Sequence, residues 1–190
     1  MGQRLSRIVT RTGDQGETAL GSGTRVDKDS PPIEALGAVD ELNSWIGVVV
    51  ALSISRQVKE VFTLVQHDLF ELSAQVSVPK TTLLSRAHLA RIEEAIDQMN
   101  AALDTSKEFI LPGGVPSSSF AHVARTVCRR AERKLFRLTE LDAPPENFGL
   151  PYLNRLSDLL FVASRLENRA AGHSDVLWER DKSLDKGPEL

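Results

Sequence analysis

Three arginines and one glutamate fall on one side of a single predicted helix. In "HVARTVCRRAERKL" the residues follow one another at about 100°, so Arg125, Arg129, Glu132 and Arg133 share one arc, beside a neighbouring arc of apolar residues. Like charges four residues apart repel by about 0.2–0.5 kcal/mol per pair. Guanidinium groups bind phosphate oxygens two at a time. The pattern therefore favours either an anion site or a solvated charged face with Glu132 as its internal partner.

A second segment with unusual chemistry lies near the N-terminus. Residues 10–25, "TRTGDQGETALGSGTR", hold four glycines, four threonines and one serine, and almost nothing that a core could bury. Ordering each residue costs about 1–2 kcal/mol of backbone entropy. This segment, hereafter the leader, is therefore either flexible or ordered by a contact that its own side chains do not supply. Glycines allow successive N–H groups to point at an anion. Hydroxyl and cationic side chains lie nearby, namely those of Thr10, Thr12, Thr18, Arg11, Arg25 and Lys28. The G-x-x-x-x-G-K-[ST] pattern of a P-loop is missing.

The first long apolar helix that we predict carries a carboxylate on a side where polar and apolar residues mix. In "IEALGAVDELNSWIGVVVAL", Asp40 and Asn43 share one side with Gly47. Glycine inside a helix costs about 1 kcal/mol relative to alanine, so Gly37 and Gly47 suggest close approach by another backbone or a ligand. A partly buried Asp40 would need a cationic partner, for which the arginine helix offers candidates. The alternative places Asp40 at the solvent edge.

Apolar spacing of three and four residues predicts the elements that must position these groups. We expect helices over residues 33–54, 56–78, 85–103, 117–141 and 152–171, with Pro79 ending the second, Ser117 or Ser118 capping the fourth and Gly172 ending the fifth. The fold class is therefore all-α, a five-helix antiparallel bundle. We expect a single domain over residues 1–190, comprising the glycine-rich segment 1–31, the bundle 32–172 and a frayed polar tail 173–190.

Composition narrows the class of protein. The net charge of −3 argues against general nucleic-acid binding. One cysteine, Cys128, excludes an internal disulfide and a cysteine-based zinc site. We find no apolar run near eighteen residues and no signal peptide, so we expect no membrane partner and a cytoplasmic location. The four histidines, His67, His88, His122 and His173, are not spaced like a metal site.

Five stretches in order resemble one known family. "TRTGDQGETALGSGTRVDKD", "VDELNSWIG", "FILPGG", "HVARTVCRRAER" and "YLNRLSDLLFVASR" are similar to motifs of the PduO-type ATP:corrinoid adenosyltransferases and span residues 10–165. The resemblance implies a homotrimer of five-helix bundles with active sites between subunits and a leader that folds over ATP. It implies transfer of the 5′-deoxyadenosyl group of ATP to the cobalt of a cob(I)alamin-type corrinoid, with release of triphosphate.

The resemblance also implies roles for individual residues. Nucleotide contacts are implied for Thr10, Arg11, Thr12, Gly13, Thr18, Ala19, Lys28, Arg129, Arg130, Glu132, Arg133 and Asn154. Many relatives carry a hydroxyl side chain where this chain has Ala19, so only the backbone could serve there. Asp40 and Arg125 match an intersubunit salt bridge on the corrinoid side. Phe109 of "FILPGG" matches an aromatic residue that crowds the lower face of the corrin and helps to remove the axial ligand.

Two further partners and two rival functions complete the expectations. Mg²⁺ is implied beside ATP, without identifiable protein ligands, and a flavin-dependent reductase is a possible partner. One rival is a binding module, a helical trimer that holds ATP or a corrinoid without transfer. The other is a nucleotide-independent helical interaction protein, for which the leader would stay sensitive to protease when ATP is present.

Overall fold

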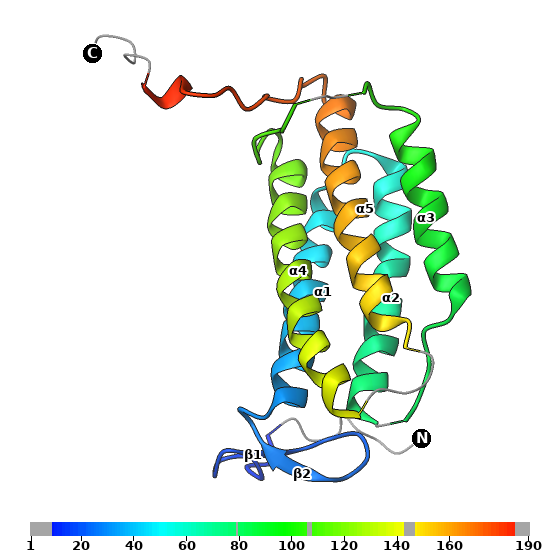
Figure 1. The fold of residues 1–190 in the computed structure, drawn as a ribbon, viewed down its shortest axis with the longest axis vertical. Coiled ribbons are helices and arrows are strands. Elements are labelled where there is room, and N and C mark those ends of the chain that lie inside the picture. Colours follow the sequence, from blue (N-terminus) through cyan, green and yellow to red (C-terminus); the bar gives the residue numbers. More distant parts are fainter. Residues whose placement is uncertain (1–8, 79, 106–107, 143–146, 185–190) are drawn as a thin grey trace.

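The bundle consists of five long helices that run alternately up and down. A computed structural model of the chain describes residues 9–78, 80–105, 108–142 and 147–184. The helices are α1 (Pro31–Leu52), α2 (Arg56–Ser77), α3 (Arg86–Asn100), α4 (Pro116–Asp142) and α5 (Gly149–Ala170). Helix α4 packs between α1 and α5, α2 packs on α1, and α3 packs on α5 (Figure 1). The predicted five-helix bundle is confirmed, with every boundary within three residues of its prediction.

Short polar motifs start and end the helices. The Ser55 side chain accepts a hydrogen bond from the Val58 N–H and so caps α2. Gly172 ends α5 as predicted, because its φ of +71° suits glycine and its N–H donates to the Arg169 carbonyl at 2.9 Å. The prediction that Ser117 or Ser118 caps α4 is wrong. The helix begins at Pro116, a residue well suited to the first helical position, and both serines lie inside it.

The core follows the apolar stripes read from the sequence. On α4 the predicted stripe is buried, and its fully or almost fully buried members are Ala124, Val127, Cys128, Ala131 and Leu135. Tyr152 of α5 and Phe62 of α2 are the largest fully buried side chains. Each such large apolar side chain contributes about 1.5–3 kcal/mol to folding. Since small residues line α4, the neighbouring helices can approach it closely.

Helix α1 is unusually apolar for a helix of this bundle. Its 22 residues and a mean hydropathy of 1.4 over 18 of them would suffice to cross a membrane by length and composition, which corrects the prediction of no apolar run of that size. Here the helix lies in the bundle, between α2 and α4. Seven of its residues are buried, from Ala35 to Val49. The structure therefore accounts for its apolar face as core.

The leader forms a small hairpin at one end of the bundle. Strands β1 (Glu17–Ala19) and β2 (Arg25–Asp27) pair antiparallel, with Thr18 opposite Val26. The turn between them rests on α2, because the Gly21 N–H donates to the Ser77 hydroxyl and the Ser22 N–H to the Ser77 carbonyl. Backbone pairing thus orders residues 17–27 without a core, a source of order that the sequence analysis did not consider.

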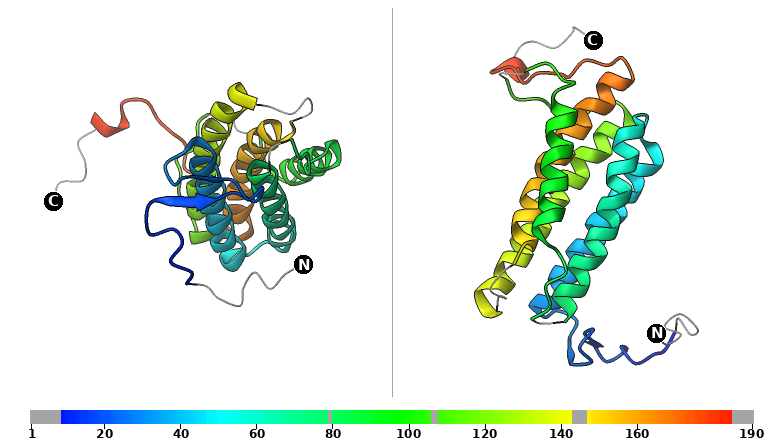
Figure 2. Two further views of the ribbon diagram at one scale, coloured as in Figure 1. Left: turned by 90° about the horizontal axis from the view of Figure 1, so that it is seen from below. Right: turned by 90° about the vertical axis from the view of Figure 1, so that its right-hand side faces the viewer.

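The tail pairs with the loop that precedes α4 at the opposite end (Figure 2). The Leu111 N–H donates to the Val176 carbonyl at 2.8 Å, and the Trp178 N–H donates to the Phe109 carbonyl at 2.7 Å. A short 3₁₀ helix, η1 (Lys182–Leu184), follows. The expectation of a frayed tail is therefore wrong for residues 174–178, and residues 185–190 lie outside the described part.

Candidate active site

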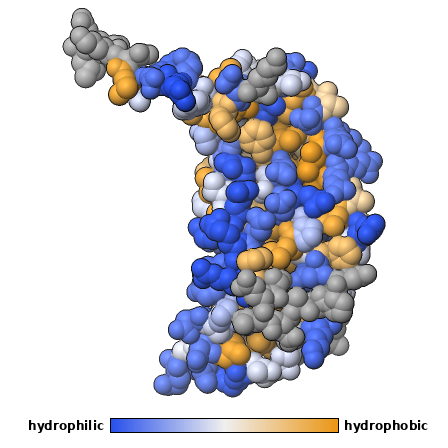
Figure 3. All heavy atoms as spheres, viewed as in Figure 1, coloured by the Kyte–Doolittle hydropathy of each residue, from blue (hydrophilic) through white to orange (hydrophobic). Residues whose placement is uncertain are grey.

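The arginine face of α4 runs along the outside of the bundle between its two ends. Arg129, Arg130 and Arg133 are exposed, and hydrophilic side chains follow this helix on the face drawn in Figure 3. The Arg133 Nη1 donates to the Arg129 carbonyl at 2.9 Å, which holds the two side chains along one line. Arg130 turns toward α1, where it pairs with Glu41. The predicted arc is confirmed for Arg129 and Arg133, whereas Arg130 serves a contact between helices.

Arg125 is the most buried cation of this face. Its Nε is buried and has no hydrogen-bond partner within residues 9–78, 80–105, 108–142 and 147–184. Burial lowers the pKa of the Arg125 guanidinium, and the nearby Arg129 charge lowers it further. A half-buried cation beside a second cation favours an anion as its partner.

Asp40 does not supply that partner within the same chain. Its side chain is exposed, and the described residues provide no ion pair to it. The interpretation of a partly buried Asp40 is therefore wrong for the single chain. The nearby Gly37 has only open space where a Cβ would stand, whereas a Cβ on Gly47 would lie 3.3 Å from the Gln66 Nε2. A side chain at Gly47 would thus press on the flexible end of Gln66, whereas the surface around Gly37 and Asp40 stays open.

Glu132 and Asn154 meet beside the arginine face. The Asn154 Nδ2 of α5 donates to the Glu132 Oε1 of α4 at 3.2 Å. Both lie on the surface between the two most closely packed helices. The structure therefore brings four predicted site residues, Arg129, Glu132, Arg133 and Asn154, to the outer side of α4 and α5.

The leader residues form a separate polar unit. The Thr10 and Thr12 hydroxyls lie 3.0 Å apart, the Lys28 Nζ donates to the Gly13 carbonyl at 2.7 Å, and Arg11 has a left-handed φ of 60°. Arg25 donates to the Thr12 carbonyl at 3.1 Å and pairs with Glu17.

Thr18 and Ala19 lie on β1, half-buried and exposed respectively. Among the described residues, no hydrogen bond or ion pair joins residues 10–28 to Arg125, Arg129 or Arg133. One chain thus holds the two sets of cationic groups apart.

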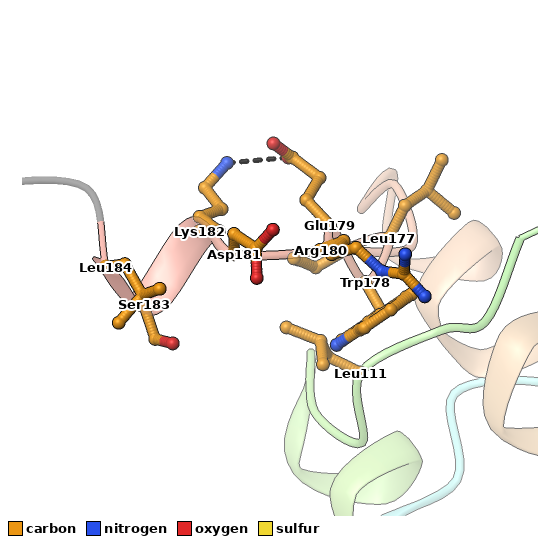
Figure 4. A pocket seen from close by; sticks show the side chains of 10 residues that line it. Leu111, Leu177, Trp178, Glu179, Arg180, Asp181, Lys182, Ser183 and Leu184 are labelled. Carbon is orange, nitrogen blue, oxygen red and sulfur yellow. Dashed lines mark hydrogen bonds and ion pairs between the residues drawn. The ribbon is translucent and has the colours of Figure 1, made fainter.

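The opposite end of the bundle exposes an apolar surface around Phe109. Phe109 is 79% exposed, and its ring packs edge-on against Trp178, with the ring centres 6.5 Å apart. A pocket of about 290 Å³ lies against Phe109, Leu111 and Trp178. A larger one of about 700 Å³ lies between Leu111 and residues 176–184 of the tail (Figure 4).

Trp178 and its neighbours are not among the site residues predicted from the sequence. Their signal was the apolar group "VLW" at residues 176–178 within an otherwise polar tail.

Two further titratable side chains, His122 and Cys128, lie buried among the helices near this face. His122 is buried beside Phe161, and burial first and the Arg125 charge second lower the pKa of its imidazole, which favours the neutral form. Burial raises the pKa of the Cys128 thiol, whose Sγ lies 3.2 Å from the Leu153 carbonyl. In the part of the chain that the structure describes, no three His, Cys, Asp or Glu side chains are grouped as a metal site. The exposed guanidinium groups of Arg129 and Arg133 can bind an anion and stabilise its charge.

Comparison with known proteins gives a consistent result. A family model described as cobalamin adenosyltransferase matches residues 8–167. The chain is 50% identical over 183 residues to a cobalamin adenosyltransferase of Cupriavidus metallidurans, covering 96% of this chain and 99% of that protein. It is 40% identical over 183 residues to the corrinoid adenosyltransferase of Bacillus subtilis, covering 92% and 93%.

Solved structures agree with these relatives. A phenylalanine-to-histidine variant of the PduO-type ATP:corrinoid adenosyltransferase from Lactobacillus reuteri, complexed with cobalamin and ATP, superposes with a TM-score of 0.86 at 32% identity, over 92% of this chain and 97% of that one. An arginine-to-lysine variant complexed with ATP gives a TM-score of 0.85 at 33% identity, over 90% and 100%.

Proposed function

This chain belongs to the cobalamin adenosyltransferase family and is an ATP:corrinoid adenosyltransferase, and we propose how its residues divide the work. The leader and the arginine face of α4 bind the triphosphate of ATP. The Phe109 end receives the corrinoid. The observation that carries this division is the arginine face itself, where the exposed Arg129 and Arg133 form no ion pair within the described residues.

The reaction needs positioning and charge stabilisation rather than a proton transfer. The cobalt of a reduced cob(I) corrinoid attacks the ribose C5′ of ATP. A cobalt–carbon bond forms, the C5′–oxygen bond breaks, and triphosphate leaves with the electron pair. Arg129 and Arg133 stabilise the charge that develops on the leaving group, and Lys28 adds to this from the leader.

Phe109 supplies the apolar side of the site. Its exposed ring, backed by Trp178, offers a dry surface for the lower face of a corrin. Keeping water and the lower ligand away from cobalt favours the four-coordinate Co(II) state, which is easier to reduce to the nucleophilic Co(I) state. The large exposed area of Phe109 supports this role, because an isolated aromatic ring gains little by facing water.

Mg²⁺ fits this site as a companion of ATP. Magnesium is usually held by substrate phosphates, water and one or two carboxylates, so it needs no cage of protein ligands. Glu132 is the carboxylate available on the outer side of α4, where it already accepts a hydrogen bond from Asn154. When bound, the ion would neutralise part of the triphosphate charge.

A homotrimer with sites between subunits explains why one chain leaves the groups apart. The open surface at Asp40 and Gly37 would meet the Arg125 side of a neighbouring copy, and the Asp40 carboxylate would then be the missing anion. We further propose a reducing cytoplasmic setting, which suits the free Cys128, and a flavin-dependent reductase as the source of reduced corrinoid.

The direct test mixes purified protein, Mg-ATP and chemically reduced cob(I)alamin without oxygen and follows the absorption spectrum. A light-sensitive alkylcobalamin spectrum that depends on both ATP and protein is expected. ATP binding without product, for cobalamin and for simpler corrinoids alike, would instead support a binding module.

A further inference from the structure

Phe109 cannot fix its own position by packing. The residue is 79% exposed, and its ring packs against Trp178, which is itself 45% exposed. An aromatic ring that must crowd one face of a flat ligand has to be held to within a fraction of an ångström. The position of Phe109 must therefore come from its backbone and from what holds that backbone.

Two chain segments hold each other at this point. Residues 109–111 and 176–178 pair antiparallel through the Leu111–Val176 and Trp178–Phe109 hydrogen bonds, with Ile110 opposite Leu177. A two-stranded pairing of three residues is not stable by itself in water. The pair needs an anchor in the bundle.

Asn168 anchors the loop side. This residue at the end of α5 is 4% exposed, and its Oδ1 accepts a hydrogen bond from the Val115 N–H at 3.1 Å. Its Nδ2 donates to the Gly113 carbonyl at 3.4 Å. Gly114 fits against the amide so closely that a Cβ there would lie 2.0 Å from the Asn168 Oδ1, and its φ is +102°. The loop can therefore rest on α5 only with glycine at 114.

Asp175 anchors the tail side and joins it to Asn168. Its Oδ1 accepts from the Asn168 Nδ2 at 3.3 Å, and its Oδ2 accepts from the Arg165 Nε at 2.7 Å. Arg165 also donates to the Asp104 carbonyl at 2.8 Å. The Arg165 and Asp175 side chains are only 11% and 16% exposed, so their charge-assisted bond is largely protected from water.

We propose that Asn168, Asp175 and Arg165 are positioning residues for the corrinoid side of the active site. They act through the paired segments 109–111 and 176–178, hereafter the loop–tail lock, to set the place of Phe109. This inference rests on the proposed function for its catalytic consequence, whereas the lock itself can be tested without substrate.

The substrate-free measurement uses tryptophan fluorescence. The chain has two tryptophans, Trp45 and Trp178, so a Trp45→Phe background reports on Trp178 alone. In that background, Asp175→Ala removes both bonds of the carboxylate, and Asp175→Asn keeps an acceptor for Asn168 but loses the charge that meets Arg165. We expect acrylamide to quench Trp178 more strongly in Asp175→Ala than in the parent, with Asp175→Asn between them.

The kinetic measurement separates the two substrates. With chemically reduced cob(I)alamin, Asp175→Ala should raise the KM for the corrinoid about tenfold, as expected for one lost charge-assisted bond, and leave the KM for ATP within about twofold. Asp68→Asn is the matched control. Asp68 is another buried carboxylate, 3% exposed, which accepts from the Tyr152 hydroxyl at 2.6 Å and pairs with Arg91. It should lower stability without changing either readout.

Several outcomes would overturn the inference. If acrylamide quenches Trp178 equally in Asp175→Ala and in the parent, Asp175 does not hold the loop–tail lock. If the KM for the corrinoid and the KM for ATP rise equally, the variant is only generally destabilised. If Asp175→Ala does not fold, Arg165→Lys, which keeps the charge but loses the fork, must show the same direction of change in both readouts. If the parent protein transfers no adenosyl group, the proposed function is contradicted. The quenching of Trp178 still tests the loop–tail lock in that case, because it needs no substrate.

Discussion

The two ends of the bundle are held by different kinds of contact. At the leader end, Arg25 and Glu17 pair with side chains 44% and 49% exposed, and such surface pairs contribute about 0–1 kcal/mol. At the opposite end, Arg165 and Asp175 pair largely out of water and connect to the buried Asn168. The difference indicates that the leader end can rearrange when a ligand binds, whereas the Phe109 end is already held in place in the free chain.

The largest expected effect concerns the arginine face between the two ends. Arg129→Ala should lower kcat by about a hundredfold or more, because removing one group that stabilises developing charge typically costs that much. Steady-state kinetics with saturating Mg-ATP and reduced cob(I)alamin provide the measurement. Arg137→Ala, at an exposed position on the same helix, is the matched control and should keep its turnover. Near-normal turnover in a correctly assembled Arg129→Ala protein would contradict the role given to Arg129.

A second prediction concerns Asp40 of α1, which we propose to serve the corrinoid side of the site. Asp40→Asn should lower kcat/KM for the corrinoid about tenfold, since it removes the charge proposed to meet Arg125 of a neighbouring copy, and should change ATP binding much less. Titrations of each substrate measure the split. An equal loss for both substrates would make Asp40 a structural residue and would leave Arg125 without its proposed anion.

A third, smaller effect is expected at the leader. Lys28→Ala removes the 2.7 Å hydrogen bond to the Gly13 carbonyl and one cation, so the KM for ATP should rise about fivefold while the corrinoid KM is unchanged. Limited proteolysis gives an independent readout, because ATP should protect the leader of the parent better than that of the variant. If the leader of the parent is equally protected without ATP, the leader end is also preformed, and the proposed difference between the two ends of the bundle is wrong.

The smallest effect is a pH dependence of stability near the preformed end. The folded protein lowers the pKa of His122 below its usual 6.5, mainly by burial. As pH falls below 6.5, the unfolded chain binds a proton that the folded chain resists, so the free energy of unfolding should decrease. Urea unfolding at about pH 7.5 and pH 5.5 should show a smaller decrease in His122→Gln than in the parent. His173→Gln, at an exposed histidine, should show the same decrease as the parent. An equal decrease in the free energy of unfolding in all three proteins would exclude His122 as the cause.

Much of the fold could be predicted because burial follows sequence period. Helices with apolar residues every three or four positions were located to within three residues, and the arginine arc followed from the same geometry. Strands β1 and β2 were missed because three residues are too few to show alternation. The cap of α4 was misplaced because Pro116 can occupy the first helical turn, which allows Ser117 to face the buried Glu167 instead.

The candidate site was only partly predictable for a different reason. Residue types indicated the arginine face and the leader, and the family resemblance indicated Phe109, but contacts between distant segments have no local signal. Arg130 pairs with Glu41 from another helix, and Asp175 meets Asn168 across the end of α5. Buried polar residues such as Glu167, which accepts hydrogen bonds from the Ile54 and Ser55 N–H groups, resemble exposed ones in a sequence.

The apolar character of α1 has a consequence for the order in which the chain is made. Its extensive partner α4 is complete only at Asp142, 90 residues after α1 ends at Leu52. At about 5–20 residues per second, a ribosome needs roughly 5–20 s to supply that partner. During this interval a helix with the length and hydropathy of a membrane span has α2 but not α4 to shield it, because α3 packs on α5, so early chaperone contact with residues 31–52 would protect the nascent chain from misdirected insertion and aggregation.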